Sequence, residues 1–390
     1  MKNNQNITIF CDGEYLSTLQ IKYDCETLLS LTSAFDVDGV VALSVIPYVS
    51  LVANSVLEII NPKTRNGIPY SKEIKDVRLK LKFFTDGYSR SKRMILNIDH
   101  LQNETFKKQG DGSLLNNKNL HCNLGIYINK DMIVLGNTQY FCYLLQDDRM
   151  LKKNLSEVCA AYKTSPESFN LIEQAENDLF EYGRICGEII GGTCKALTNY
   201  DNTISIKSKS HPIDIYGVDI NTNTSELFTS KESDKGAVLY LLHILSTLNS
   251  LLYILNSFEQ DDYGWWLKTN YITYYYSIMK LKSLQAYYNQ NKPIPDELSN
   301  LFKELNLDNA PYLNGIFRNY VMHSRFVDKD NFIINKAYLN KTKPLFGLVE
   351  TCFDGKSYDE IKLSVISEMN RISDILAQWL NINLLSRKAL

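Results

Sequence analysis

The sequence predicts an α+β protein in which an N-terminal mixed α/β region is followed by a C-terminal all-α helical bundle. Three observations predict this class. Strand-like runs lie before residue 230, helical periodicity dominates from residue 234, and a polar stretch at residues 200–233 separates the two. A chain of 390 residues is long enough for two or three domains, so we expect domains at residues 1–230 and 231–390. A further break near residue 150 would divide the first into two subdomains.

The N-terminal region contains short apolar runs of the kind found in strands. Residues 77–84 alternate charged and apolar side chains, which is the period-two pattern of a half-buried strand. Two apolar runs flank Asn129-Lys130-Asp131, which predicts a hairpin. In chain order, we expect strands at residues 7–10, 15–23, 77–84, 125–128, 132–135, 140–145 and 213–220. Residues 151–197 instead follow a helical pattern, with a break near Thr164-Ser165-Pro166.

Residues 40–60 form an apolar segment of about the length that spans a bilayer. The segment contains Glu58, Asn54, Pro47 and three serines, a composition that favours a buried core helix over a membrane span. The N-terminus lacks the basic and apolar regions of a signal peptide. We therefore expect a cytoplasmic protein without membrane contact.

Net charge and cysteine spacing exclude several classes of protein. Lys and Arg total 42 against 44 Asp and Glu, so the net charge of -2 excludes a uniformly basic surface that coats nucleic acid but allows a local basic cleft. The eight cysteines form no C-x-x-C pair, which indicates reduced, mostly buried thiols. Because His121-Cys122 has no second Cys/His pair nearby, we expect no bound metal and no other cofactor.

From residue 234 onward, apolar residues recur at helical spacing and predict a helical bundle. The predicted helices cover residues 234–258, 265–288, 296–305 and 311–326, followed by one that starts at residue 357 and extends through Trp379. Asn309 and Pro311 supply a cap and a first-turn proline for the fourth helix. Ser357 and Glu360 form a capping box at the start of the last.

The predicted helix at residues 311–326 carries the one group of side chains with evident chemistry. Asn319 and His323 lie one turn apart on one flank of its apolar stripe, and Arg318 lies on the other flank. An arginine, an amide and a histidine would thus stand at the edge of a packed face, where a second subunit could complete a cleft. The apolar stripe that we expect to face the core consists of Leu313, Ile316, Phe317, Tyr320 and Val321.

The run Gly315-Ile316-Phe317-Arg318-Asn319-Tyr320-Val321-Met322-His323 resembles the signature of the HEPN superfamily. Members of this superfamily are helical-bundle domains with an R-x(4–6)-H motif, in which a polar residue such as Asn often follows the arginine. The resemblance implies a metal-independent endoribonuclease with Arg318, Asn319 and His323 as catalytic residues of a composite site in a homodimer. Arg325 is a further candidate, as a contact to phosphate in the substrate.

These residue types suit RNA cleavage without a metal. Histidine, with a usual pKa of about 6.5, can transfer a proton at neutral pH, and an arginine fork binds two phosphate oxygens. The Asn319 amide could orient His323 or hold a phosphate oxygen. By family resemblance, such proteins act as toxins or in host defence, including abortive infection, and cut tRNA or mRNA once triggered. We expect the N-terminal region to bind the trigger, either a regulatory protein or a ligand.

Two other interpretations of the bundle stay open. Some HEPN proteins are non-catalytic scaffolds that bind a partner protein, nucleotide or RNA. Alternatively, the bundle could serve only dimerisation while the N-terminal region holds the function.

Other histidines and aromatic residues have less specific patterns. A second match to the loose motif spacing, Arg93 to His100, lacks the polar residue after the arginine. His243 lies among leucines, which favours a core or subunit-contact position. The helical spacing of Tyr271, Tyr274, Tyr275 and Tyr276 favours the same positions over stacking on RNA bases.

Overall fold

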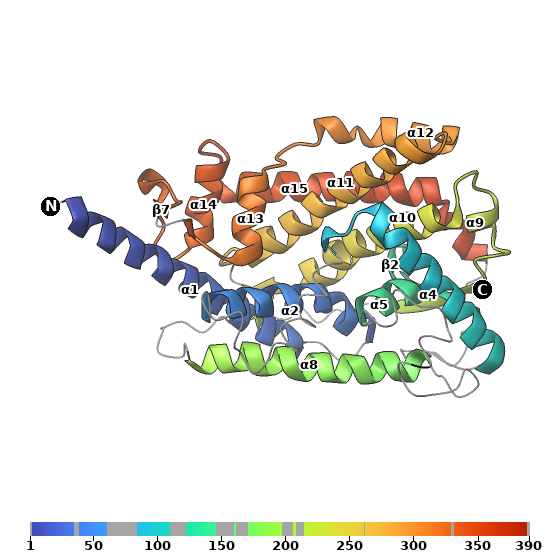
Figure 1. Ribbon diagram of the computed structural model, residues 1–390, viewed down its shortest axis with the longest axis horizontal. Coiled ribbons are helices and arrows are strands. Elements are labelled where there is room, and N and C mark those ends of the chain that lie inside the picture. The colour runs from blue at the N-terminus through green and yellow to red at the C-terminus, as the bar shows by residue number, and fades with distance from the viewer. Residues whose placement is uncertain are drawn as a thin grey trace.

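The computed structural model describes residues 2–34, 39–60, 84–109, 122–145, 160, 171–196, 206–207, 214–260, 262–328 and 331–387. These residues are mostly helical, with one three-stranded antiparallel sheet (Figure 1). The predicted α+β class is therefore confirmed. The strand expected at residues 77–84 lies outside the described residues except for its last residue, and so does the break expected near residues 164–166.

Long helices dominate the N-terminal region. They are α1 (Lys2–Ala34), α2 (Gly39–Ile60), α4 (Tyr88–Gln109), α5 (Thr138–Leu145) and α8 (Leu171–Ala196). Helix α2 confirms the core helix expected at residues 40–60, and α8 lies within the segment expected to be helical at residues 151–197.

Three predicted strands are helical in the structure. Residues 7–10 and 15–23 both lie in α1, where Leu16, Leu19 and Tyr23 are buried at helical spacing. The strand expected at residues 140–145 belongs to α5. The Oδ1 atom of Asn137 accepts a 2.8 Å hydrogen bond from the backbone N–H of Tyr140, so this side chain caps the start of α5.

The antiparallel sheet has the strand order β2-β1-β4, with β1 at Leu124–Asn129, β2 at Val134–Asn137 and β4 at Ile215–Ile220. The predicted hairpin is confirmed, because β1 and β2 pair in antiparallel register. Asn129 stabilises its turn: the side-chain oxygen accepts hydrogen bonds from the backbone N–H groups of Asp131 and Ile133 at 3.0 and 2.9 Å. The strand predicted at residues 213–220 is also confirmed as β4, which pairs with β1.

The predicted long helices of the C-terminal part are confirmed as α10 (Lys235–Asn249), α11 (Trp265–Asn291), α12 (Asp296–Leu305) and α15 (Tyr358–Leu380). Helix α10 continues through a π-helical turn, η1 (Ser250–Ile254), and a 3-10 turn, η2 (Leu255–Ser257). Ser357 caps α15 as predicted, because its hydroxyl accepts a hydrogen bond from the backbone N–H of Glu360 at 3.2 Å.

The remaining elements are short. Helices α9 (Glu226–Thr229) and α14 (Pro344–Cys352) were not predicted, and neither was the small hairpin of β6 (Val327–Asp328) and β7 (Asn331–Phe332). The others are β3 (Ile206–Lys207), β5 (Glu259–Gln260), η3 (Leu307–Asn309), η4 (Lys336–Tyr338) and η5 (Ile382–Arg387).

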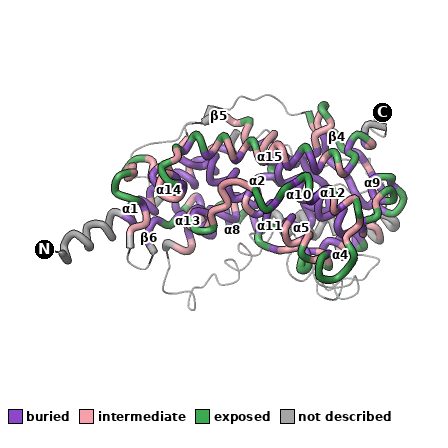
Figure 2. The backbone as a smooth tube through the Cα atoms, turned by 90° about the horizontal axis from the view of Figure 1, so that it is seen from above, coloured by how far each residue is buried: buried purple, intermediate pink, exposed green. Residues whose placement is uncertain are grey.

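The buried apolar side chains of the described residues form a hydrophobic core that includes elements from both sides of residue 230. Helix α2 packs against α1, α8 and α13 (Gly315–His323), and α11 packs against α10, α13 and α15. In Figure 1, α8 lies along one side of the molecule and α12 along the other, with α2, α10 and α11 between them. In Figure 2, much of the tube in this middle layer has the colour of buried residues. A domain boundary near residue 230 stays a prediction.

Two helices in the described part of the chain are long and apolar enough to cross a membrane, Val40–Glu58 and Lys235–Ser257. In each of them, more than four fifths of the apolar stretch is buried inside the protein. Such burial agrees with the core helix expected at residues 40–60, and the cytoplasmic location stays a prediction.

Candidate functional site

Helix α13 carries the three motif residues, and it begins later than the sequence predicts. Asn314 rather than Asn309 is the N-cap, and Pro311 lies in a turn before the helix. The Oδ1 atom of Asn314 accepts hydrogen bonds of 2.9 Å from the backbone N–H groups of the second and third helical residues. This cap fixes the start of the helix because it satisfies two N–H groups that every helix leaves without an internal partner.

The C-terminal end of α13 is held by α1 and α2 of the N-terminal region and by α11 of the C-terminal part. Ser324, directly after His323, is buried with a left-handed φ of 45°. Its hydroxyl lies 2.6 Å from Nζ of Lys268 and 3.0 Å from Oδ2 of Asp24, and these two charged groups form a buried ion pair of 2.5 Å. Ser55 of α2 donates a 3.1 Å hydrogen bond to the carbonyl of the residue before His323. The backbone on both sides of His323 is therefore anchored.

Only part of the predicted apolar stripe of α13 faces the core. Phe317 and Val321 are buried, together with Met322, but Ile316 is 63% exposed. The expectation that Ile316 faces the core is therefore wrong, and the other two predicted residues, Leu313 and Tyr320, are only half-buried. The reason is geometric: this nine-residue helix packs mainly on α2, α11 and α14, so a narrow strip of its surface is covered.

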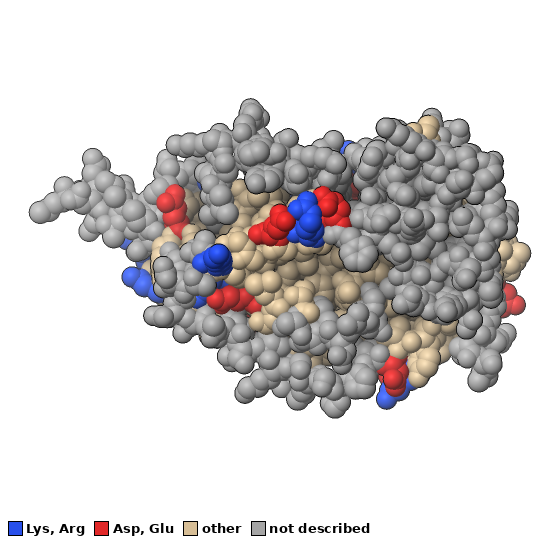
Figure 3. Space-filling view, turned by 90° about the horizontal axis from the view of Figure 1, so that it is seen from below, with Lys and Arg blue, Asp and Glu red and all other residues tan. Residues whose placement is uncertain are grey.

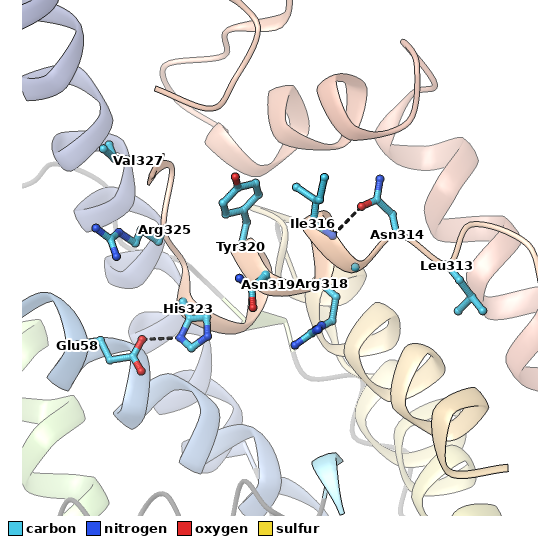
Figure 4. Close-up of a pocket in the computed structure, with 11 residues that line it drawn as sticks. Glu58, Leu313, Asn314, Ile316, Arg318, Asn319, Tyr320, His323, Arg325 and Val327 are labelled. Carbon is cyan, nitrogen blue, oxygen red and sulfur yellow. Dashed lines mark hydrogen bonds and ion pairs between the residues drawn. The ribbon is translucent and has the colours of Figure 1, made fainter. Parts of the chain in front are cut away.

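Arg318, Asn319 and His323 line one cavity of about 1040 Å³, formed by α13, the end of α2 and the turn after α13. In Figure 4, these three side chains extend from one side of α13, with Asn319 between the other two, whereas Ile316 and Tyr320 extend from the opposite side. The structure thus brings the predicted site residues together, although helical periodicity alone places Arg318 on a different flank.

Glu58, in the last turn of α2, contacts His323 directly. Its Oε2 atom lies 2.5 Å from Nδ1 of the imidazole, and its Oε1 atom accepts a 3.2 Å hydrogen bond from Asn54. The side chain of His323 is 38% exposed and that of Glu58 is 18% exposed, so the pair is partly shielded but reachable from solvent. Among the described residues, the hydrogen bond to the histidine ring thus comes from Glu58 and not from Asn319.

Two tyrosines of α11 hold Arg318. Its Nη1 atom donates a 3.1 Å hydrogen bond to the hydroxyl of Tyr276, and its Cζ atom lies 5.3 and 5.7 Å from the ring centres of Tyr275 and Tyr276. Among the described residues, the buried Nε atom of Arg318 has no hydrogen-bond partner. The ring contacts fix the guanidinium plane, while N–H groups of Nη1 and Nη2 that do not bind Tyr276 can donate to phosphate oxygens.

Arg325, the predicted phosphate contact, is exposed and lines the same cavity beyond His323 (Figure 4). Elsewhere, the described part of the face in Figure 3 shows Lys and Arg side chains beside Asp and Glu, with uncharged residues between these groups. That mixture agrees with the near-zero net charge of the chain, and the cavity likewise combines two arginines and one histidine with the acidic Glu58.

Glu58 and Tyr276 were not predicted from the sequence to be parts of the site. The sequence does distinguish Glu58, because it is the only charged residue in the largely apolar helix α2. Its partner could not be read from the sequence, since 265 positions separate Glu58 from His323.

The second match to the motif spacing lies elsewhere in the molecule. Arg93 and His100 are exposed on α4 and are not among the residues that line the cavity.

His243 is buried as expected, and burial lowers its pKa to about 3. The core positions expected for the tyrosines of α11 are confirmed for Tyr271, Tyr274 and Tyr276, which are buried, whereas Tyr275 is only partly buried.

Within the described ranges, no group of three or more His, Cys, Asp or Glu side chains is placed to hold a metal ion. The residues at the cavity can transfer a proton at an imidazole, stabilise negative charge with guanidinium groups and donate hydrogen bonds from an amide. No family model, curated protein or solved structure matches the chain. Its function is therefore inferred from the motif and from the geometry around α13.

Proposed function

We propose that the protein is a metal-independent endoribonuclease of the HEPN type, in which residues 231–390 form the helical bundle and two copies form a composite site. One observation carries this proposal: Arg318, Asn319 and His323, which match the R-x(4–6)-H motif in sequence, line a single solvent-accessible cavity. A histidine enclosed by hydrocarbon could not exchange protons with a substrate, whereas His323 is 38% exposed and, among the residues that the structure describes, is hydrogen-bonded through Nδ1 only.

In the proposed reaction, the 2′-oxygen of a ribose forms a bond to the adjacent phosphorus while the bond from phosphorus to the 5′-oxygen breaks. Nε2 of His323 accepts the proton of the 2′-hydroxyl. Arg318 stabilises the negative charge that builds up on the non-bridging phosphate oxygens, and Asn319 donates an N–H to one of them. The leaving oxygen takes a proton from the imidazolium of the second copy. The products carry a 2′,3′-cyclic phosphate and a 5′-hydroxyl.

The biological role that accompanies this activity is that of a toxin or defence effector, such as an abortive-infection protein, that acts on tRNA or mRNA in the cytoplasm. A protein with a net charge of -2 is suited to a localised contact with RNA, since broad electrostatic attraction to phosphates requires a net excess of basic residues. In this proposal, the N-terminal region binds the regulatory protein or ligand that triggers cleavage.

The proposal is tested by incubation of the purified protein with total RNA in the presence of EDTA. We expect cleavage products with 2′,3′-cyclic phosphate ends. Arg318→Ala and His323→Ala each lower the cleavage rate by about 10²-fold or more, because each removes a group that acts in the transition state. The matched control is the double variant Arg93→Ala/His100→Ala, which alters the second motif match on α4 and keeps the wild-type rate.

Two outcomes would contradict the ribonuclease. RNA that is bound but stays intact with every trigger tested would favour the non-catalytic scaffold. Cleavage that survives both Arg318→Ala and His323→Ala would place the activity elsewhere in the chain, as in the interpretation that assigns the function to the N-terminal region.

A further inference from the structure

Glu58 occupies a position that the stability of α2 alone does not favour. It is the only charged residue of this 22-residue helix and lies in the last turn, where the helix dipole disfavours an anion. Its side chain is 18% exposed, so the carboxylate has lost most of its hydration. A carboxylate in such a place requires hydrogen-bond donors to compensate for the lost water.

At least two donors of the described residues contact this carboxylate. Asn54, one turn earlier on α2, donates to Oε1 at 3.2 Å, and Nδ1 of His323 lies 2.5 Å from Oε2. Because a carboxylate has no proton to give, the proton of the second hydrogen bond resides on Nδ1. The other ring nitrogen, Nε2, is then the one available to a ligand in the cavity (Figure 4).

We propose that Glu58 is the positioning residue for His323: it holds the imidazole in the Nδ1–H tautomer and directs Nε2 towards the cavity. The tautomer matters because Nε2 can accept the proton of a 2′-hydroxyl only while it carries none. When the imidazole takes up this proton, the negative charge of Glu58 stabilises the imidazolium that forms. A buried carboxylate plays the same role beside the histidine of serine proteases. In its catalytic part, this inference rests on the proposed ribonuclease function.

The first test needs no substrate. Protein labelled with ¹⁵N-histidine is studied by long-range ¹H–¹⁵N correlation spectra, with the His323 signals assigned from their absence in His323→Gln. We expect neutral His323 to be protonated at Nδ1 in the wild type and to populate the Nε2–H form in Glu58→Gln. Glu188→Gln is the matched control, because this glutamate is exposed on α8 in an ion pair with Arg184, and it leaves the His323 signals unchanged.

The second test measures catalysis. Glu58→Gln keeps the size of the side chain but removes the charge, so we expect kcat to fall by about 10²-fold or more while KM changes less than about threefold. The midpoint of thermal unfolding of each variant is the control for intact folding. A loss of overall packing would instead lower the midpoint and the content of active protein without changing the tautomer of His323.

The outcomes separate this inference from the proposed function. A wild-type His323 protonated at Nε2, or a Glu58→Gln variant that cleaves as fast as the wild type, overturns the role of Glu58 and leaves the ribonuclease in place. A Glu58-dependent tautomer in a protein that cleaves no RNA supports the positioning of the ring and rejects the ribonuclease. A changed tautomer together with a lower kcat supports both.

Discussion

His243 is a buried histidine of α10 whose energetic effect depends on pH. Burial, and secondly the charge of Lys280, lower its pKa from 6.5 to about 3. Between these two pH values, His243 binds a proton in the unfolded chain but not in the folded protein. Acidification therefore stabilises the unfolded state relative to the folded state. The contribution of neutral His243 to stability is therefore complete above pH 6.5 and is lost progressively as the pH falls towards 3.

Replacement of His243 by leucine should remove this acid sensitivity. We expect the free energy of unfolding of the wild type to fall by about 2 kcal/mol more than that of His243→Leu between pH 7.5 and pH 5. Urea unfolding at the two pH values measures this difference. His100→Leu, on the exposed face of α4, is the matched control for the replacement of a histidine by leucine. Equal slopes for wild type and His243→Leu would show that the buried imidazole does not cause the effect.

The ion pair of Asp24 and Lys268 connects two helices beneath the end of a third. Asp24 belongs to α1 and Lys268 to α11, both side chains are 1% exposed, and both contact Ser324 at the C-terminal end of α13. A buried charge without its partner costs far more free energy than the intact ion pair. Each of the two groups therefore offsets the cost of burying the other. Helix α1 is thereby tied to the residue that follows His323.

Lys268→Met should lower the free energy of unfolding by about 3–5 kcal/mol, because it leaves the Asp24 carboxylate buried without a counter-charge. The double variant Asp24→Asn/Lys268→Met should cost at least about 1 kcal/mol less than the sum of the two single variants. A denaturant-unfolding cycle of the four proteins provides this comparison. Additive costs would indicate that the two charges do not interact in the folded protein.

Elements with local signals could be predicted from the sequence, and elements that depend on tertiary packing could not. The cap of α15 by Ser357 and the turn at Asn129 need only neighbouring residues, and both are confirmed. The apolar runs within α1 fit strand and helix periods equally well over a few residues. Packing against α2 and α8 decides in favour of the helix, and a short window of sequence contains no trace of these contacts.

The candidate site shows the same division. Arg318, Asn319 and His323 lie within six residues of one helix, so their spacing reveals them. Tyr276 contacts Arg318 from a position 42 residues away, and Glu58 contacts His323 from a position 265 residues away. No periodicity connects such distant partners, and only the folded chain identifies them.

At the scale of the whole molecule, the exposed Ile316 offers a test of the proposed homodimer. It lies on α13 at the rim of the cavity and is 63% exposed. If two copies meet along α13, Ile316→Glu should weaken dimerisation by at least about tenfold, which corresponds to about 1.4 kcal/mol, and should lower RNA cleavage in parallel. Analytical ultracentrifugation over a range of protein concentrations measures the dissociation constant.

Leu363→Glu is the matched control for this prediction, because Leu363 is similarly exposed, at 68%, on α15. Neither residue contributes to the core, so both variants should fold as the wild type does. A wild-type monomer, or a dimer that Leu363→Glu weakens as strongly as Ile316→Glu, would show that the subunits do not associate through α13.

The long sequence separation of Glu58 and His323 has a consequence for synthesis of the protein. Glu58 is synthesised 265 residues before His323, whose backbone is held by α1 and α2. A nascent chain must therefore grow by 265 residues after Glu58 before these two groups can meet. An enzyme that attacks RNA would stay inert towards its own messenger over that part of translation.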